Sequence, residues 1–254
     1  HENYHPFFGD GMIHGIRVED GKALWYKNKF VTSPFGFGPN THVLKHGEKI
    51  YALVEGGVSP VILDSEMNFL EEEPFPAADN KRFTAHPKID SDTGEMHAVS
   101  YDFGEYVNGL GQVHYVTIDS NGKLIKDQII ETPSRPMVHD CAITKNYVLI
   151  FDLPVTFNLG RRDDDNNPIG GDYPVVWNDK HTSRVGLQNK KTDEIIWIEV
   201  NPGFLFHIVN SYEDDNGQVV LDFCRYERLF DFDNPLPMGQ KPFLTRWILD
   251  PKTK

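Results

Sequence analysis

Three of the eleven histidines in the sequence stand in local settings that favour metal binding. His86, His139 and His207 each lie near the start of an apolar, strand-like run. A neutral imidazole is a common ligand for transition metals. The three are too far apart in the sequence to form a local motif such as a zinc finger. Their spacing leaves two interpretations open, a metal site assembled from separate elements and a set of structural histidines.

The elements that would have to position these histidines are β-strands. Short runs rich in β-branched and aromatic residues recur along the chain and show no sustained helical period. Asn-Gly pairs at 121–122 and 216–217 separate such runs, and both residues of the pair accept the positive φ of a hairpin turn. We predict an all-β fold of the sandwich, barrel or propeller type. The expected strands include residues 50–54, 96–101, 113–118, 147–153, 195–200 and 219–223.

Composition excludes one class of partner and indicates a compartment. The formal net charge of −13 argues against nucleic acid, because phosphate binding needs a basic surface. The only two cysteines, Cys141 and Cys224, lie in apolar runs, so we expect free thiols and a reducing compartment such as the cytoplasm. No apolar run approaches the ~18 residues of a membrane-spanning helix, and peripheral contact with a membrane stays open.

The histidines share the chain with two glycine-rich motifs. In chain order, the five motifs are GDGMIHG at 9–15, ALVEGG at 52–57, TAHPKID at 84–90, MVHDCAIT at 137–144 and FLFHIVNSYE at 204–213. They resemble motifs of the carotenoid cleavage oxygenases, a family that includes carotenoid, apocarotenoid and stilbene dioxygenases and is related to the retinal pigment epithelium membrane protein. The likeness extends from about residue 8 to about residue 250, and FDLPVTF at 151–157 looks most like the microbial branch.

The resemblance implies a seven-bladed β-propeller that holds Fe(II) on its axis through four histidines. It assigns the first three ligands to His86, His139 and His207, and it makes Glu55 a carboxylate that accepts the other ring N–H of a ligand. Thr41 resembles a threonine that lines the open side of the iron in some members. The implied enzyme is an oxidoreductase, a dioxygenase that adds both atoms of O2 across a carbon–carbon double bond and yields two carbonyl products.

The sequence departs from the family pattern on the C-terminal side of His207. No histidine follows this residue, whereas the family's fourth ligand lies near the C-terminus of longer chains. We therefore expect residues 1–254 to form a single β-propeller domain that is incomplete at both ends. Such a fragment supplies three of the four ligands, and the identity of the fourth stays unknown.

The choice of substrate depends on residues near the expected iron site. Stilbene cleavers carry a phenol-binding lysine just before the carboxylate that Glu55 resembles, and here that position is Val54. We therefore favour a hydrophobic carotenoid or apocarotenoid as the substrate beside O2. Met137 and Phe206 are expected to line its tunnel, although core packing accounts for both equally well. A stilbene dioxygenase is the alternative within the family, and a non-catalytic propeller scaffold is the alternative outside it.

Overall fold

The regular structure of the chain consists of β-strands, which confirms the predicted all-β class. No helix long and apolar enough to cross a membrane occurs in the part of the chain that the structure describes. The computed structural model describes residues 9–31, 38–55, 59–72, 83–101, 113–157, 175–231 and 240–253.

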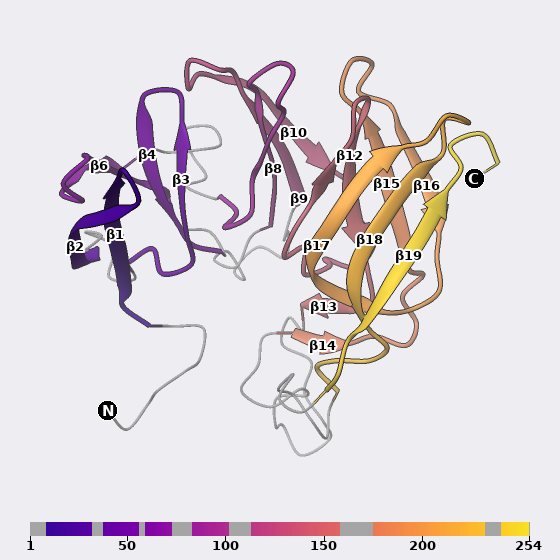
Figure 1. The fold of residues 1–254 in the computed structure, drawn as a ribbon. Coiled ribbons are helices and arrows are strands. Elements are labelled where there is room, and N and C mark those ends of the chain that lie inside the picture. Colours follow the sequence, from indigo (N-terminus) through magenta and orange to yellow (C-terminus); the bar gives the residue numbers. More distant parts are fainter. Residues whose placement is uncertain are drawn as a thin grey trace.

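In the N-terminal half of the chain, strands that follow one another pair with one another. This pattern gives one hairpin and two four-stranded sheets, all antiparallel (Figure 1). The hairpin is β1 (Gly11–Glu19) and β2 (Lys22–Val31); the first sheet is β3 (His42–His46), β4 (Lys49–Leu53), β5 (Val61–Leu63) and β6 (Phe69–Glu72); the second is β7 (Lys88–Ile89), β8 (Met96–Tyr101), β9 (Val113–Ile118) and β10 (Leu124–Ile130).

The C-terminal half interrupts this pattern once. Strand β12 pairs with β15, because β13 and β14 form a separate hairpin between them. The result is a third four-stranded sheet, β11-β12-β15-β16, followed by the three-stranded sheet β17-β18-β19. The bounds are β11 (Ala142–Ile143), β12 (Tyr147–Asp152), β13 (Val155–Phe157), β14 (Val175–Trp177), β15 (Arg184–Asn189), β16 (Ile195–Glu199), β17 (Phe204–Glu213), β18 (Val219–Tyr226) and β19 (Phe243–Leu249).

Tight turns join the strands, two of them at the predicted Asn-Gly pairs. The turn between β1 and β2 has Asp20 at φ 49° and Gly21 at φ 73°. In the Asn-Gly turns, Gly122 adopts φ 86° and Gly217 adopts φ 79°. A left-handed residue matches the twist of a tight hairpin, and glycine adopts it without a Cβ penalty. The turn chemistry therefore fixes where the strands end, and the strands predicted at 96–101 and 113–118 coincide with β8 and β9.

Glycine is required at Gly11, in the first glycine-rich motif. A Cβ at this position would come within 1.9 Å of the carbonyl oxygen of Pro39, in the segment that precedes β3. At Gly9, two residues earlier, nothing lies within 4 Å of the Cβ position. The motif thus serves a close approach of two backbones, which only a residue without a side chain permits.

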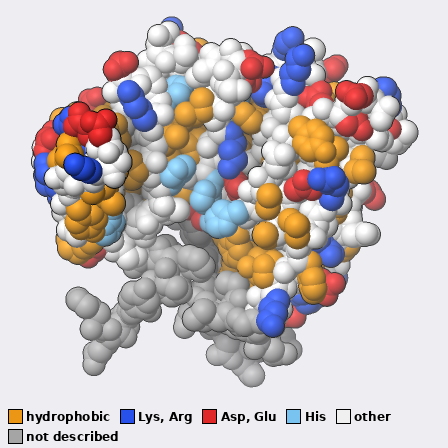
Figure 2. Space-filling model, in the orientation of Figure 1, with side chains coloured by type: hydrophobic (Ala, Val, Ile, Leu, Met, Phe, Trp, Pro, Cys, Tyr) orange, Lys and Arg blue, Asp and Glu red, His pale blue; other side chains and the backbone are white. Residues whose placement is uncertain are grey.

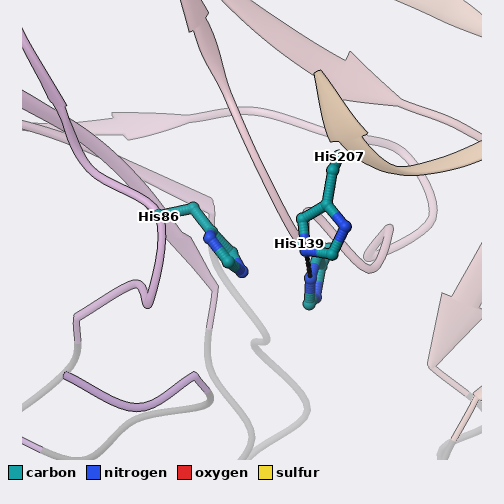
Figure 3. A group of neighbouring side chains, drawn as sticks. All are labelled: His86, His139 and His207. Carbon is teal, nitrogen blue, oxygen red and sulfur yellow. Dashed lines mark hydrogen bonds between the residues drawn. The ribbon is translucent and has the colours of Figure 1, made fainter. Parts of the chain in front are cut away.

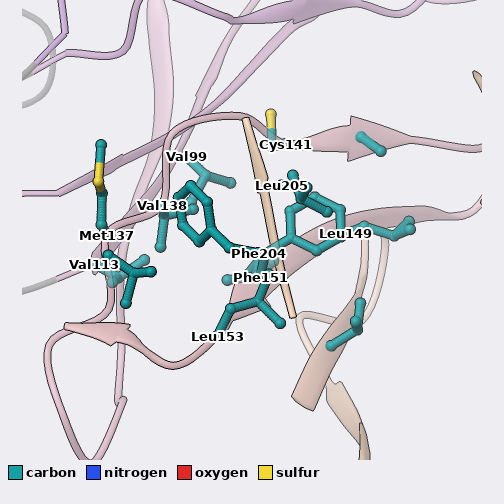
Figure 4. Close-up of a cluster of buried hydrophobic side chains, with 14 of the residues drawn as sticks. Val99, Val113, Met137, Val138, Cys141, Leu149, Phe151, Leu153, Phe204 and Leu205 are labelled. Carbon is teal, nitrogen blue, oxygen red and sulfur yellow. The ribbon is translucent and has the colours of Figure 1, made fainter. Parts of the chain in front are cut away.

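The largest apolar cluster lies among the sheets of the C-terminal half. Strands β8 and β9 are buried on both faces along their whole length, as strands covered on both sides must be. Figure 4 shows part of this cluster, in which Phe204 of β17 and Phe151 of β12 lie beside the chain that leads through Val138 to Cys141. Phe204 is 1% exposed and Val138 is 1% exposed, so both chain segments are held firmly by packing.

The sheets follow one another in chain order across the molecule, from the indigo hairpin of β1 and β2 to the yellow strand β19 (Figure 1). Strands β3, β7, β11 and β17 each stand at one edge of a sheet and are its first strand in the sequence. A histidine lies on each of these strands or shortly before it, namely His42, His86, His139 and His207. The fold therefore delivers one histidine from each of four successive sheets.

Candidate metal centre

The structure brings His86, His139 and His207 together from three different sheets. One ligand atom from each of these residues lies within 4.8 Å of the others. The rings converge from three directions in Figure 3, and their centroids are 4.7 to 5.0 Å apart. The backbone ladder of β17 is irregular on both sides of Ile208, and such irregularities re-aim a side chain, here that of His207.

The spacing of two of the three ring nitrogens suits ligands of a single metal ion. Nε2 of His139 and Nε2 of His207 are 3.2 Å apart. Two neighbouring ligands at the ~2.1 Å metal–nitrogen distance of histidine sites stand about 3.0 Å apart. Nε2 of His86 is buried and has no hydrogen-bond partner among the described residues. A buried polar atom without a partner is costly, and coordination would satisfy it.

Partial removal from water and the mutual repulsion of the clustered rings favour the unprotonated form of two of them, which is the form that binds metals. Burial, followed by the neighbouring His139 and His207, lowers the pKa of His86 from 6.5 to about 3. The pKa of His207 is also lowered, again by burial first and by His139 second. A metal binds only the unprotonated ring nitrogen. At neutral pH these two rings are therefore ready to bind an ion without first losing a proton.

Glu55 lies behind the ring of His139. Its Oε2 is 2.6 Å from Nδ1 of His139, and its Oε1 accepts a hydrogen bond from the hydroxyl of Tyr101. The distance to His139 is within hydrogen-bonding range, although the ring N–H is not aimed squarely at the oxygen. A carboxylate in this place can accept the N–H of the ring nitrogen that faces away from the ion. The two glycines at 56–57 of the same motif lie outside the described residues.

The four residues predicted to face O2 or the substrate have different surroundings. Phe206 is half-buried and packs edge-on against His139, with ring centroids 5.0 Å apart and an interplanar angle of 88°. Met137 is buried in the large apolar cluster, and Val54 is half-buried beside Glu55. Thr41 is exposed, and its hydroxyl donates to Oδ1 of Asn40. Their functional roles stay predictions.

Apolar and histidine side chains gather on the same face of the molecule. In Figure 2, pale-blue histidines lie near the middle of this face, and orange apolar side chains adjoin them. A metal centre bordered by apolar side chains suits a substrate that is itself apolar.

Two further residues of the site were not singled out by the sequence. The ring of His42 stacks on His86, with centroids 6.3 Å apart, and its Nδ1 is 2.9 Å from the carbonyl oxygen of Ala85. Tyr101 holds Glu55 from the end of β8. His42 could have been recognised by its position, because it lies on the first strand of its sheet, and each histidine of the cluster lies on or shortly before the first strand of its own sheet.

Comparison with known proteins agrees with this geometry. A family model described as retinal pigment epithelial membrane protein matches residues 38–254. The carotenoid cleavage oxygenase of Mycobacterium tuberculosis (strain ATCC 25618 / H37Rv) is 33% identical to this chain over an alignment of 306 residues, gaps included. The alignment covers 97% of this chain and 60% of that protein. The chain thus spans less than two thirds of the length of this relative.

Two solved structures show the same fold. A variant of the Synechocystis apocarotenoid oxygenase superposes with a TM-score of 0.78 at 23% identity and covers 98% of this chain and 60% of its own. The lignostilbene dioxygenase of Pseudomonas brassicacearum gives a TM-score of 0.78 at 24% identity and covers 97% of this chain and 57% of its own. The sheets described above are therefore blades of a β-propeller. Together with the match over residues 38–254, this shows that the chain belongs to the family of the retinal pigment epithelial membrane protein and the carotenoid cleavage oxygenases.

Proposed function

We propose that the full-length protein is a non-haem Fe(II) dioxygenase that cleaves a carbon–carbon double bond of a carotenoid or apocarotenoid with O2. One observation carries the proposal: His86, His139 and His207, from three separate blades, present nitrogen atoms within 4.8 Å of one another. The family to which the chain belongs gives this cluster a chemical context. We further propose that the full-length protein closes into one propeller domain of seven blades and supplies a fourth ligand.

In this proposal, the three histidines hold the iron through the ring nitrogens that face one another. Fe(II), when bound, supplies the activation of O2 for addition across the alkene. Neutral imidazoles bring no negative charge, so Glu55 compensates part of the iron charge through the ring of His139. The hydroxyl of Tyr101 fixes the other oxygen of Glu55. This pair of contacts sets the orientation of the His139 ring before the iron arrives.

The apolar residues beside the cluster have a separate task, which is to hold a polyene and exclude water. Phe206 presents its ring edge-on to His139, and Val54 lies next to Glu55. A polyene gains free energy when such side chains cover it, at about 25 cal/mol per Å² of apolar surface. The substrate chain has no polar group that would need a partner at Val54.

Metal and product analysis of the full-length protein tests the proposal. After anaerobic purification, about one iron per chain is expected, and incubation with an apocarotenal and O2 should yield two carbonyl fragments identified by mass. Zinc in place of iron would favour a hydrolase instead. A protein that binds no metal and leaves the polyene intact would favour a non-catalytic scaffold.

Stilbene cleavage is the second candidate. The observation in its favour is that the lignostilbene dioxygenase superposes as well as the apocarotenoid oxygenase, with a TM-score of 0.78 in both cases. The fold therefore does not separate the two substrates. The distinction depends on single side chains near the cluster, of which Val54 is the first.

A further inference from the structure

Asp140 is a buried carboxylate next to the histidine cluster, and its hydrogen bonds and ion pair within the described part of the chain go to groups other than the three rings. It directly follows His139 in the chain, and its side chain is 3% exposed. Its Oδ1 accepts a hydrogen bond from the backbone N–H of Cys141 at 2.7 Å and lies 2.6 Å from Nζ of Lys88. Its Oδ2 accepts the backbone N–H of Ile208 at 3.2 Å. A buried charge is tolerated only when it is paired in this way.

The partners of Asp140 are neighbours of the other two histidines of the cluster. Lys88 opens β7, two residues after His86, and Ile208 directly follows His207 on β17. A single carboxylate thus joins the three chain segments that carry the histidines, and these segments belong to three different sheets.

A second contact joins two of the same segments. The thiol of Cys141 lies 3.9 Å from the carbonyl oxygen of His86, which is within range for a weak S–H donor. The segment of His86 is therefore tied to the segment of Asp140 by two contacts, one through the carbonyl group of His86 and one through the side chain of Lys88.

We infer that Asp140 is a positioning residue of the metal centre, which holds the three histidine-bearing segments at the separation that lets their rings share one ion. This inference rests on the proposed function, since it presumes that the cluster binds a metal. The role differs from that of Glu55: Glu55 approaches a ring nitrogen, whereas the hydrogen bonds of Asp140 are to backbone N–H groups. Ring nitrogens must be placed to within a few tenths of an ångström to share an ion, so loose backbones cost metal affinity.

Cobalt titration of the full-length apoprotein tests the inference, because visible absorption of Co²⁺ reports both affinity and coordination. In Asp140→Asn, the amide nitrogen replaces one accepting oxygen and the charge opposite Lys88 is lost. We expect Co²⁺ to bind about 10-fold more weakly, the low end of the loss seen when groups around a metal site are changed. The absorption bands of the bound Co²⁺ should also shift.

Asp152→Asn is the matched control. Asp152 is equally buried, with its side chain 0% exposed, and is paired with Arg184 at 2.7 Å, but it lies on β12 away from the cluster. This variant should lower the melting temperature of the apoprotein without changing Co²⁺ affinity or absorption. If both variants weaken Co²⁺ binding to the same extent, Asp140 has a general structural role and the inference is wrong.

Lys88→Met decides the matter if Asp140→Asn does not fold. Lys88 is 29% exposed at its side chain, and Lys88→Met keeps both backbone hydrogen bonds of Asp140 but removes the cation paired with its buried charge, so a less stable protein with weaker Co²⁺ binding is expected. Unchanged Co²⁺ affinity in a folded Asp140→Asn or Lys88→Met would overturn the inference and leave the proposed function intact. A parent protein that binds neither Co²⁺ nor iron would overturn both.

Discussion

Glu55 is the residue whose surroundings say most about the chemistry of the site. Three neutral imidazoles create a cationic centre once a divalent ion binds, and Glu55 is the carboxylate that lies 2.6 Å from one of those rings. Its other oxygen is held by Tyr101, so the carboxylate cannot turn away without breaking a second contact. In the proposed function, charge compensation and ring orientation therefore depend on the same side chain.

We predict that Glu55→Gln lowers iron affinity or turnover about 10- to 100-fold in the full-length protein. The variant keeps the size of the side chain and removes its charge. Iron content and cleavage rate should be measured together. Glu71→Gln is the control, because Glu71 is 63% exposed and its ion-pair partner within the described part of the chain is Lys49, at 4.0 Å. Equal iron content and turnover in the parent and Glu55→Gln would refute the assignment.

Within the candidate site, only residues that stand in recognisable sequence motifs could be predicted from the sequence. His86, His139 and His207 stand in recognisable local contexts, and the structure brings them together. The roles of Tyr101 and Asp140 were not predictable, because each depends on a contact with a residue far away in the chain. The local sequence around Tyr101 does not indicate a contact with Glu55, and the local sequence around Asp140 does not indicate a contact with the backbone of Ile208.

At the scale of elements, turn chemistry allowed the strands to be predicted well in the middle of the chain. Strand β9 coincides with the predicted 113–118, because Asn-Gly at 121–122 marks the turn that follows. Two features were not predicted: the long hairpin of β1 and β2, and the insertion of the β13–β14 hairpin between β12 and β15. Local patterns say where a strand lies, but which strands pair is settled by packing.

We predict that Gly11→Ala destabilises the protein by about 1–3 kcal/mol or more, the usual cost of forcing extra volume into packed structure. The added Cβ would meet the Pro39 carbonyl oxygen at 1.9 Å, so the backbones of β1 and of the segment before β3 must move apart. Gly9→Ala in the same motif is the matched control, since nothing lies within 4 Å of its Cβ position. Thermal unfolding of both variants checks this, and equal melting temperatures would contradict it.

A buried histidine at the pairing of β8 with β9 predicts that the protein loses stability in mild acid. His97 on β8 is 1% exposed, and its Nδ1 is 2.9 Å from the hydroxyl of Tyr115 on β9. Burial, and secondarily the charge of Lys190, lowers the pKa of His97 from 6.5 to about 4. Between pH 6.5 and pH 4, the imidazole of His97 is protonated in the unfolded chain and neutral in the folded protein. Stability therefore falls as the pH falls from 6.5 to 4, by about 3 kcal/mol in full.

Replacing His97 by glutamine tests this origin of the acid sensitivity. Glutamine retains a polar partner for Tyr115 and does not titrate, so the variant should lose less stability than the parent between pH 7 and pH 4.5. Urea unfolding at the two pH values measures the difference in free energy of unfolding. The same pH dependence in both proteins would assign the effect to other groups.

At the scale of the whole molecule, the fold of the family is shared by enzymes with different substrates. The structures of an apocarotenoid oxygenase and a lignostilbene dioxygenase superpose on this chain with the same TM-score of 0.78. We therefore expect the propeller to supply the convergent histidines and the side chains around them to select the substrate. Phe206 and Val54 give this part of the site an apolar character.

We predict that the full-length protein cleaves an apocarotenal faster than a hydroxystilbene. A phenol buried against Val54 without a partner loses roughly 1–3 kcal/mol, or about one to two powers of ten in affinity, whereas a polyene loses nothing there. Val54→Lys should raise the relative rate on the hydroxystilbene, and Val54→Met, similar in length but uncharged, should not. Rates on both substrates with Fe(II) and O2, with the aldehyde products identified by mass, provide the measurement. Preferential cleavage of the hydroxystilbene by the parent protein would mean that another polar group near the cluster, with Tyr101 the nearest phenol to Glu55, holds the substrate hydroxyl in place of a lysine.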